Sequence, residues 1–107
     1  MHPYYLMKDL LKPIFQKSGH QEISEELHPD VFGSAFSVFD NGRCKIRLIW
    51  DGKDGWGYAQ TFNQDAREKS QEWQDVSCFL TEGDLESVPQ NQEKIEEFYA
   101  VVEKIVA

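Results

Sequence analysis

Apolar and polar residues alternate most regularly between Phe32 and Phe62, in segments separated by short polar turns. This period of two is typical of β-strands with one buried and one solvated face. The turn Asp40-Asn41-Gly42-Arg43 is typical of a type I′ hairpin, because Asn and Gly accept positive φ angles. With Asn41 and Gly42 as the two loop residues, the expected strand pairs are Asp40 with Arg43, Phe39 with Cys44, Ser37 with Ile46, Ala35 with Leu48 and Gly33 with Trp50.

The next turn, Asp51-Gly52-Lys53-Asp54-Gly55, joins Trp50 to Trp56. An odd number of loop residues predicts that alternate residues of the following strand share the face of Trp50: Trp56, Tyr58, Gln60 and Phe62. A further apolar run from Trp73 to Leu80 predicts a fourth strand. The remaining segments are expected to be connections: an irregular one over 20–30 that ends in His28-Pro29-Asp30, an exposed polar loop over 63–71, and a third over 81–91.

Helical spacing of apolar residues appears near both ends of the chain. The first helix is expected from Pro3 to Ser18, with the stripe Tyr5, Leu6, Leu10, Ile14 and Phe15, and Pro13 predicts either a kink or the start of a second short helix. The last helix is expected from about Pro89 or Asn91 to Val106, with the stripe Ile95, Phe98, Tyr99, Val102, Ile105 and Val106. The pattern predicts one α+β domain over residues 1–107, in which N-terminal and C-terminal helices pack on an antiparallel meander of about four strands.

Charge narrows the classes of partner. The 107 residues include 19 acidic and 11 basic side chains, for a net charge of −8. Nucleic acid and anionic membranes repel such a surface, so neither is an expected partner, whereas a basic protein is favoured. Solubility alone explains the charge equally well. No apolar run approaches the ~20 residues that span a bilayer, and no secretory signal opens the sequence, so we expect a cytoplasmic protein that is a monomer or weak dimer when free.

The histidines and cysteines match no catalytic or metal-binding motif. His2, His20 and His28 do not form the C-x-x-C or H-x-x-x-H spacing of zinc sites, and no cofactor is expected. Cys44 and Cys78 are interpreted as buried reduced thiols rather than as a disulfide, although their strands could be neighbours. A cysteine and histidine pair is conceivable in any fold, but the apolar surroundings disfavour a thiolate, so we expect no enzyme.

Aromatic and acidic residues suggest a surface that binds a protein partner. Trp50 and Tyr58 are assigned to the core, whereas Trp56 and Trp73 lie at strand ends and are left open between core and surface. The acidic residues near the second turn, in the connection over 81–91 and in the first turns of the last helix would steer a basic partner. The candidate partner-binding residues are Asp51, Asp54, Trp56, Glu82, Asp84, Glu86, Glu93 and Glu97.

The chain resembles the small acidic immunity proteins of bacterial toxin and immunity pairs, in particular those of contact-dependent growth inhibition systems. The resemblance rests on size, acidity, a sheet with flanking helices, the lack of a catalytic motif, and the aromatic turns Ile49-Trp50-Asp51-Gly52 and Asp54-Gly55-Trp56-Gly57. It implies a cytoplasmic protein that binds one cognate toxin domain, often a cationic nuclease, and blocks its active site. Two alternatives are a small adaptor module that binds through an open sheet edge and an uncharacterised small hydrolase.

Overall fold

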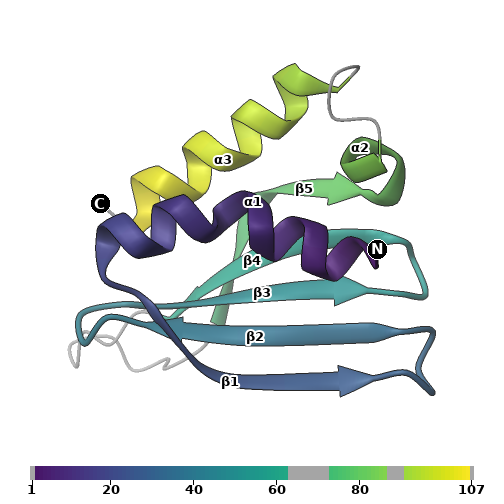
Figure 1. Cartoon of the computed structure of the whole chain (residues 1–107), viewed down its shortest axis with the longest axis horizontal. Helices are drawn as coiled ribbons and strands as arrows, with labels where there is room; N and C mark the ends of the chain where they lie inside the picture. Colours follow the sequence, from purple (N-terminus) through teal and green to yellow (C-terminus); the bar gives the residue numbers. More distant parts are fainter. Residues whose placement is uncertain (1, 63–72, 87–90, 107) are drawn as a thin grey trace.

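The computed structural model describes residues 2–62, 73–86 and 91–106. Its strands form one antiparallel sheet in sequence order, and Figure 1 shows that β1 and β5 are the edges. Helix α1 packs across β2, β3 and β4, and α3 lies beside α1 and packs on β5. The predicted α+β meander with terminal helices is therefore confirmed, with one more strand than expected. The elements are α1 (Pro3–Ser18), β1 (Gln21–His28), β2 (Ser34–Asp40), β3 (Lys45–Asp51), β4 (Trp56–Phe62), β5 (Trp73–Thr81), α2 (Glu82–Glu86) and α3 (Gln92–Val106).

Helix α1 has the predicted bounds, and local chemistry explains both ends. His2 is the N-cap, because its Nδ1 accepts the backbone N–H of Tyr4 at 3.2 Å. Gly19 ends the helix in the left-handed region, with a φ of 76°. Pro13 lies within an uninterrupted helix, so no second helix starts there.

The buried stripe of α1 differs in part from the prediction. Ile14 and Phe15 are buried as expected, but Tyr5 is 40% exposed. Tyr4 is fully buried instead, and its hydroxyl finds polar partners in Ser37 of β2 and Glu25 of β1. A buried tyrosine needs such partners, which the spacing of apolar residues cannot reveal.

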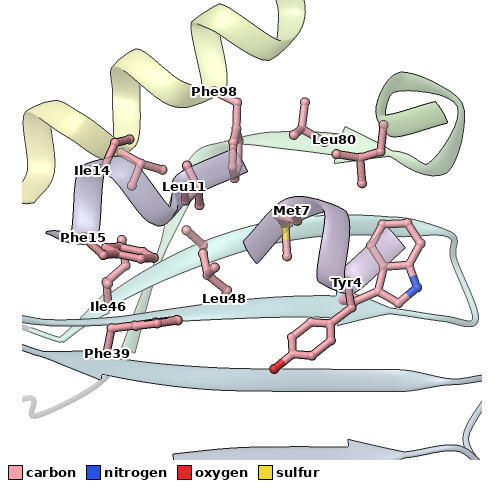
Figure 2. Close-up of a cluster of buried hydrophobic side chains, with 14 of the residues drawn as sticks. Tyr4, Met7, Leu11, Ile14, Phe15, Phe39, Ile46, Leu48, Leu80 and Phe98 are labelled. Atoms are coloured by element: carbon pink, nitrogen blue, oxygen red, sulfur yellow. The ribbon is translucent and has the colours of Figure 1, made fainter. Parts of the chain in front are cut away.

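One hydrophobic core lies between the helices and the sheet (Figure 2). Helix α1 approaches β4 closely because that strand has a glycine under Met7: a Cβ at Gly57 would lie 2.7 Å from the Met7 sulfur and 2.9 Å from the Trp50 ring. Helix α3 buries much of its predicted stripe. Fully buried side chains of this core include Met7, Leu11, Ile46, Leu48, Leu80, Phe98 and Val102.

The register of the first hairpin was wrong by two residues. Asp40 pairs with Lys45, and Ser37 with Leu48, so residues 41–44 form the loop. Only Gly42 has a positive φ there, 86°, whereas a type I′ turn needs two such residues. The Asn41 side chain explains the longer loop, because its Oδ1 accepts the N–H groups of Arg43 and Cys44 at 2.9 Å each. A shift of two residues keeps every side chain on its predicted face.

The second turn changes the faces of β4. Asp51 pairs with Trp56, which leaves an even-numbered loop over 52–55. Consequently Gly57 and Ala59 share the core face with Trp50, and the predicted placement of the alternate residues Trp56, Tyr58, Gln60 and Phe62 on that face was wrong. Tyr58 is thus half-buried on the opposite face, not in the core under the helices.

Strand β1 replaces the irregular connection expected over 20–30. All its residues are exposed, so it has no alternation of buried and polar positions. Backbone pairing with β2 forms it, and Lys8 of α1 holds it by ion pairs to Glu22 and Glu25. The strand therefore depends on tertiary contacts that a hydrophobic pattern does not show.

The connection expected over 81–91 contains the short helix α2. The polar loop predicted over 63–71 lies outside the described residues, as do residues 87–90. The predicted strand from Trp73 to Leu80 is confirmed as β5, which extends to Thr81.

Candidate functional site: the loop end of the sheet

Three segments far apart in the sequence meet at one end of the sheet: the β1–β2 loop over 29–33, the β3–β4 turn over 52–55, and α2 (Figure 1). The backbone N–H of Gly52 donates at 3.0 Å to the Oγ of Ser34, the residue directly after the β1–β2 loop, which holds the turn beside that loop. The N–H of Glu82 donates to the carbonyl of Gly55 at 3.4 Å, which joins α2 to the turn. We call this region the loop-end surface and define it by its exposed side chains Asp30, Val31, Phe32, Lys53, Asp54, Trp56, Phe79, Glu82 and Glu86.

Phe32 is the most exposed large apolar side chain of the described residues, at 70%. It is also the only non-glycine residue among them with a positive φ, 56°. A bulky residue rarely adopts this conformation, which costs about 1–2 kcal/mol. Gly52 holds the loop in place, since its backbone passes so close that a Cβ there would lie 1.9 Å from the Phe32 carbonyl oxygen. The fold thus maintains a strained backbone that presents an aromatic ring to solvent.

Asp51, the last residue of β3, and Asp54, in the β3–β4 turn, have different roles. Asp51 Oδ1 accepts the N–H groups of Lys53 at 3.0 Å and Asp54 at 3.1 Å, so this carboxylate shapes the turn. Asp54 is exposed at the tip. Of the two predicted site residues, Asp54 is therefore the one that faces outward.

Trp56 and Phe79 form an aromatic pair at the edge of the loop-end surface. Their ring centroids are 5.2 Å apart, and the side chains are 39% and 43% exposed. The amino group of Lys94 in α3 lies 5.0 Å from the centroid of Phe79. Trp56, left open between core and surface in the sequence, is therefore at the surface. It packs on Phe79, which Lys94 of α3 contacts in turn.

Asp84 lies inside the protein, unlike its predicted companions Glu82 and Glu86. Its carboxylate accepts the N–H and the hydroxyl of Thr81 at 2.8 and 2.9 Å and pairs with Lys94 at 2.8 Å. Burial alone would raise the pKa of Asp84, but Lys94 and Thr81 together lower it below its usual value. Asp84 thus anchors α2 and the start of α3, whereas Glu82 and Glu86 remain exposed.

The predicted residues of α3 lie beside this region. Glu93 and Glu97 are both exposed, and the ion pair of the neighbouring Lys94 brings the first turn of the helix to α2. Glu97 lies one turn farther along α3, whose axis leads away from the loop end (Figure 1). Glu93 therefore extends the loop-end surface more directly than Glu97 does.

The loop-end surface combines apolar anchors with negative charge. Lys53 is its only cation, against the acidic Asp30, Asp54, Glu82 and Glu86. A hollow of about 300 Å³ opens beside it, lined in part by Val31, Phe36, Ile49 and Lys53. Aromatic anchors next to a concave apolar surface are typical of protein-binding sites. The sequence did not predict three residues of this surface, Val31, Phe32 and Phe79. For Val31 and Phe32, the available signal was an apolar pair in a loop, directly before Gly33.

A second cluster brings a cysteine and a histidine together. His20 is buried, with its Nδ1 2.6 Å from Ser18 Oγ and its Nε2 3.1 Å from the carbonyl oxygen and 3.3 Å from the sulfur of Cys44. Many covalent catalysts place a nucleophile next to a histidine that accepts its proton. The protonation states of His20 and Cys44 therefore decide whether this pair could act in that way.

Hydrogen bonding and burial both oppose an activated thiol. A carbonyl oxygen can only accept, so the Nε2 of His20 donates to Cys44 and has no lone pair for the thiol proton. Burial lowers the pKa of His20 and raises the pKa of Cys44, which favours the neutral pair. The Asn41 side chain also donates to the carbonyl of Ser18 at 3.1 Å. The cluster therefore ties the β2–β3 turn to the end of α1.

The face of the sheet opposite the helices is half-buried and aromatic. The guanidinium of Arg47 lies 4.4 Å from the ring centroid of Trp73 and 5.6 Å from that of Phe36, and its Nε donates to Gln60 at 2.9 Å. Trp73 also packs on Phe62, with centroids 5.3 Å apart. Trp73, left open between core and surface in the sequence, is therefore half-buried on this face, in contact with the guanidinium of Arg47.

Comparison with models of protein families, with curated proteins and with solved structures found no match. Within residues 2–62, 73–86 and 91–106, no helix has the length and apolar character needed to cross a membrane. In the same residues, no three histidine, cysteine or acidic side chains gather as metal ligands would.

Proposed function

We propose that this chain is an immunity protein that binds a cognate, cationic toxin domain in the cytoplasm and neutralises it by covering its active site. The observation that carries the proposal is the loop-end surface, where exposed aromatic side chains and a net negative charge occur together. A nuclease that binds nucleic acid needs a basic groove, and the same groove attracts carboxylates. Phe32 and Trp56 would supply contact area, and the acidic residues around them would steer association.

Strain at Phe32 supports the proposal independently of charge. An exposed ring on an unfavourable backbone does not stabilise the free protein, yet Gly52 and Ser34 maintain it. Residues held in such conformations cluster at functional sites, where binding uses them. The pair of His20 and Cys44 gives no comparable support to a hydrolase, because burial raises the pKa of the thiol and the Nε2 of His20 donates to the Cys44 carbonyl.

The test is native mass spectrometry of the purified chain mixed with the product of the neighbouring upstream gene, together with a nuclease assay of that product. We expect a stoichiometric complex and loss of the nuclease activity. No complex, or a complex that leaves the activity intact, would overturn the proposal.

A charge-matched pair of variants then locates the surface. Glu82→Lys with Glu86→Lys should slow association at low salt, because both side chains are exposed at the loop end. The control, Asp9→Lys with Glu103→Lys, changes the net charge equally at exposed positions elsewhere. Equal slowing by both pairs would show that only the total charge matters and would remove the loop end from the proposal.

A further inference from the structure

Exposed apolar side chains concentrate on one edge of the sheet. Of the seven large hydrophobic residues exposed in the described part of the chain, four lie within residues 23–32. Ile23 and Leu27 belong to β1 and are 55% and 51% exposed. Strand β1 pairs only with β2, so its outer side has no strand neighbour among the described residues. An edge strand with exposed apolar residues is a template for pairing with another strand.

Two of the three carboxylates of β1 do not protect this edge as edge charges usually do. Glu22 and Glu25 turn toward α1, where both pair with Lys8. Tyr4 also donates to Glu25 at 2.8 Å. Together these contacts lower the pKa of Glu25 and compensate its charge within the chain. The β-bulge between Glu22 and Ser24 falls at Ile23, and the pairing with β2 is regular from Ser24 to His28.

We propose that β1 pairs with β1 of a second copy of this chain, antiparallel and about a two-fold axis at Glu25. This register places Ile23 opposite Leu27 of the other copy, and Leu27 opposite its Ile23. An interface of this kind is self-complementary, as two-fold symmetry requires, and the two cross-strand apolar pairs cover the side chains that are exposed in the monomer.

Charge selects this register over its neighbours. With the axis at Glu25, Glu26 faces Ser24 of the second copy, and the only facing carboxylates are the two compensated Glu25 side chains. A shift of one residue toward the start of the strand places Ile23 opposite Glu26. A shift in the other direction pairs Glu25 with Glu26 twice. Like charges directly opposite each other destabilise strand pairing.

The dimer is expected to be weak and to respond to salt. The paired segment is short, and small interfaces belong to transient complexes. Each copy carries a net charge of −8, so screening of the repulsion between copies should strengthen the dimer as salt increases. The proposed pairing uses none of the loop-end acidic residues, so it stands or falls independently of the proposed function.

Sedimentation equilibrium of the purified chain at low and high salt tests the proposal. We expect a concentration-dependent dimer that Leu27→Lys abolishes, because the variant places a lysine opposite Ile23 of the other copy. Ala100→Lys is the matched control, since it adds the same charge at an exposed position on α3. A monomer at every soluble concentration would overturn the proposal. A dimer that Leu27→Lys leaves intact would do the same.

Cross-linking tests the register itself. Glu25→Cys places a thiol on the axis, so that two copies should be joined rapidly by oxidation. Glu26→Cys is the control, because it faces Ser24 of the second copy and not itself. Wild-type protein measures the background from Cys44 and Cys78. Cross-linking of Glu26→Cys as fast as that of Glu25→Cys would exclude the proposed register.

Discussion

The ammonium group of Lys94 lies 2.8 Å from the buried carboxylate of Asp84, and the same group lies over the ring of Phe79. One lysine therefore links α3 to α2 and to β5. Because Phe79 packs on Trp56, this ion pair also supports part of the loop-end surface. The sequence placed Asp84 among the partner-binding residues, whereas the structure shows it in internal contacts.

Replacing the buried carboxylate should destabilise the fold. Asp84→Asn removes the charge of a carboxylate that contacts Thr81 twice and Lys94 once. Hydrogen bonds to charged groups contribute about 1.5–3 kcal/mol each, so we expect the free energy of unfolding to fall by ~2 kcal/mol. Urea denaturation at neutral pH measures it. Glu86→Gln is the control at an exposed position of the same helix and should change little.

The pH dependence of this loss follows from the pKa of Asp84, which folding lowers. The unfolded chain binds the proton more readily, so the carboxylate stabilises the folded state above its unfolded pKa. That stabilisation disappears as the pH falls through the folded pKa. The difference between the wild type and Asp84→Asn should therefore shrink in acid below the ordinary aspartate pKa of 3.8. A difference that stays constant from neutral pH to strong acid would contradict this assignment.

A methyl group at Gly52 should force the two loops apart. The added Cβ would meet the carbonyl oxygen of Phe32 at 1.9 Å, and backbone atoms cannot move aside as a flexible side chain can. We expect Gly52→Ala to lower the free energy of unfolding by about 1–3 kcal/mol, as overpacking does. Gly83→Ala is the control, because its nearest neighbour is Thr81 Oγ1 at 3.9 Å. Similar urea midpoints for both variants would show that the loops are not in close contact.

Stability and binding should respond in opposite directions at Phe32. Glycine adopts positive φ readily, so Phe32→Gly should relieve part of the ~1–2 kcal/mol that a left-handed residue costs. The lost ring is largely exposed and contributes little to the core. We expect thermal unfolding at an equal or higher temperature, with weaker binding to the cognate toxin domain. A marked loss of stability would show that the ring has an internal role.

The fold could be predicted from the sequence where one face of an element is buried. The alternation around Ile46 and Leu48 predicted the hairpin, and the spacing of Phe98 and Val102 predicted the last helix, because burial imposes those periods. Strand β1 was missed because it buries no side chain. The face of Trp56 was predicted wrongly because a loop longer or shorter by one residue reverses the faces of the strand that follows it. The composition of the turn does not determine whether the loop has an odd or an even number of residues.

The candidate site was only partly predictable for the same physical reason. Composition indicated an acidic and aromatic surface, and the structure places Asp54, Trp56, Glu82 and Glu86 at one end of the sheet. The conformation of Phe32 depends on the approach of a loop about twenty residues away in sequence, which local signals cannot indicate.

The reactivity of Cys44 separates the binding proposal from the hydrolase alternative. Burial raises the pKa of this thiol, and His20 donates its Nε2 proton to the Cys44 carbonyl instead of accepting the thiol proton. Iodoacetamide at mildly alkaline pH should therefore alkylate Cys44 more slowly in the folded protein than in urea, as peptide mass spectrometry can measure. His20→Gln should not slow the reaction further, because the ring does not activate the thiol. Alkylation that is faster in the folded protein, and that His20→Gln abolishes, would instead identify an activated cysteine and favour the hydrolase.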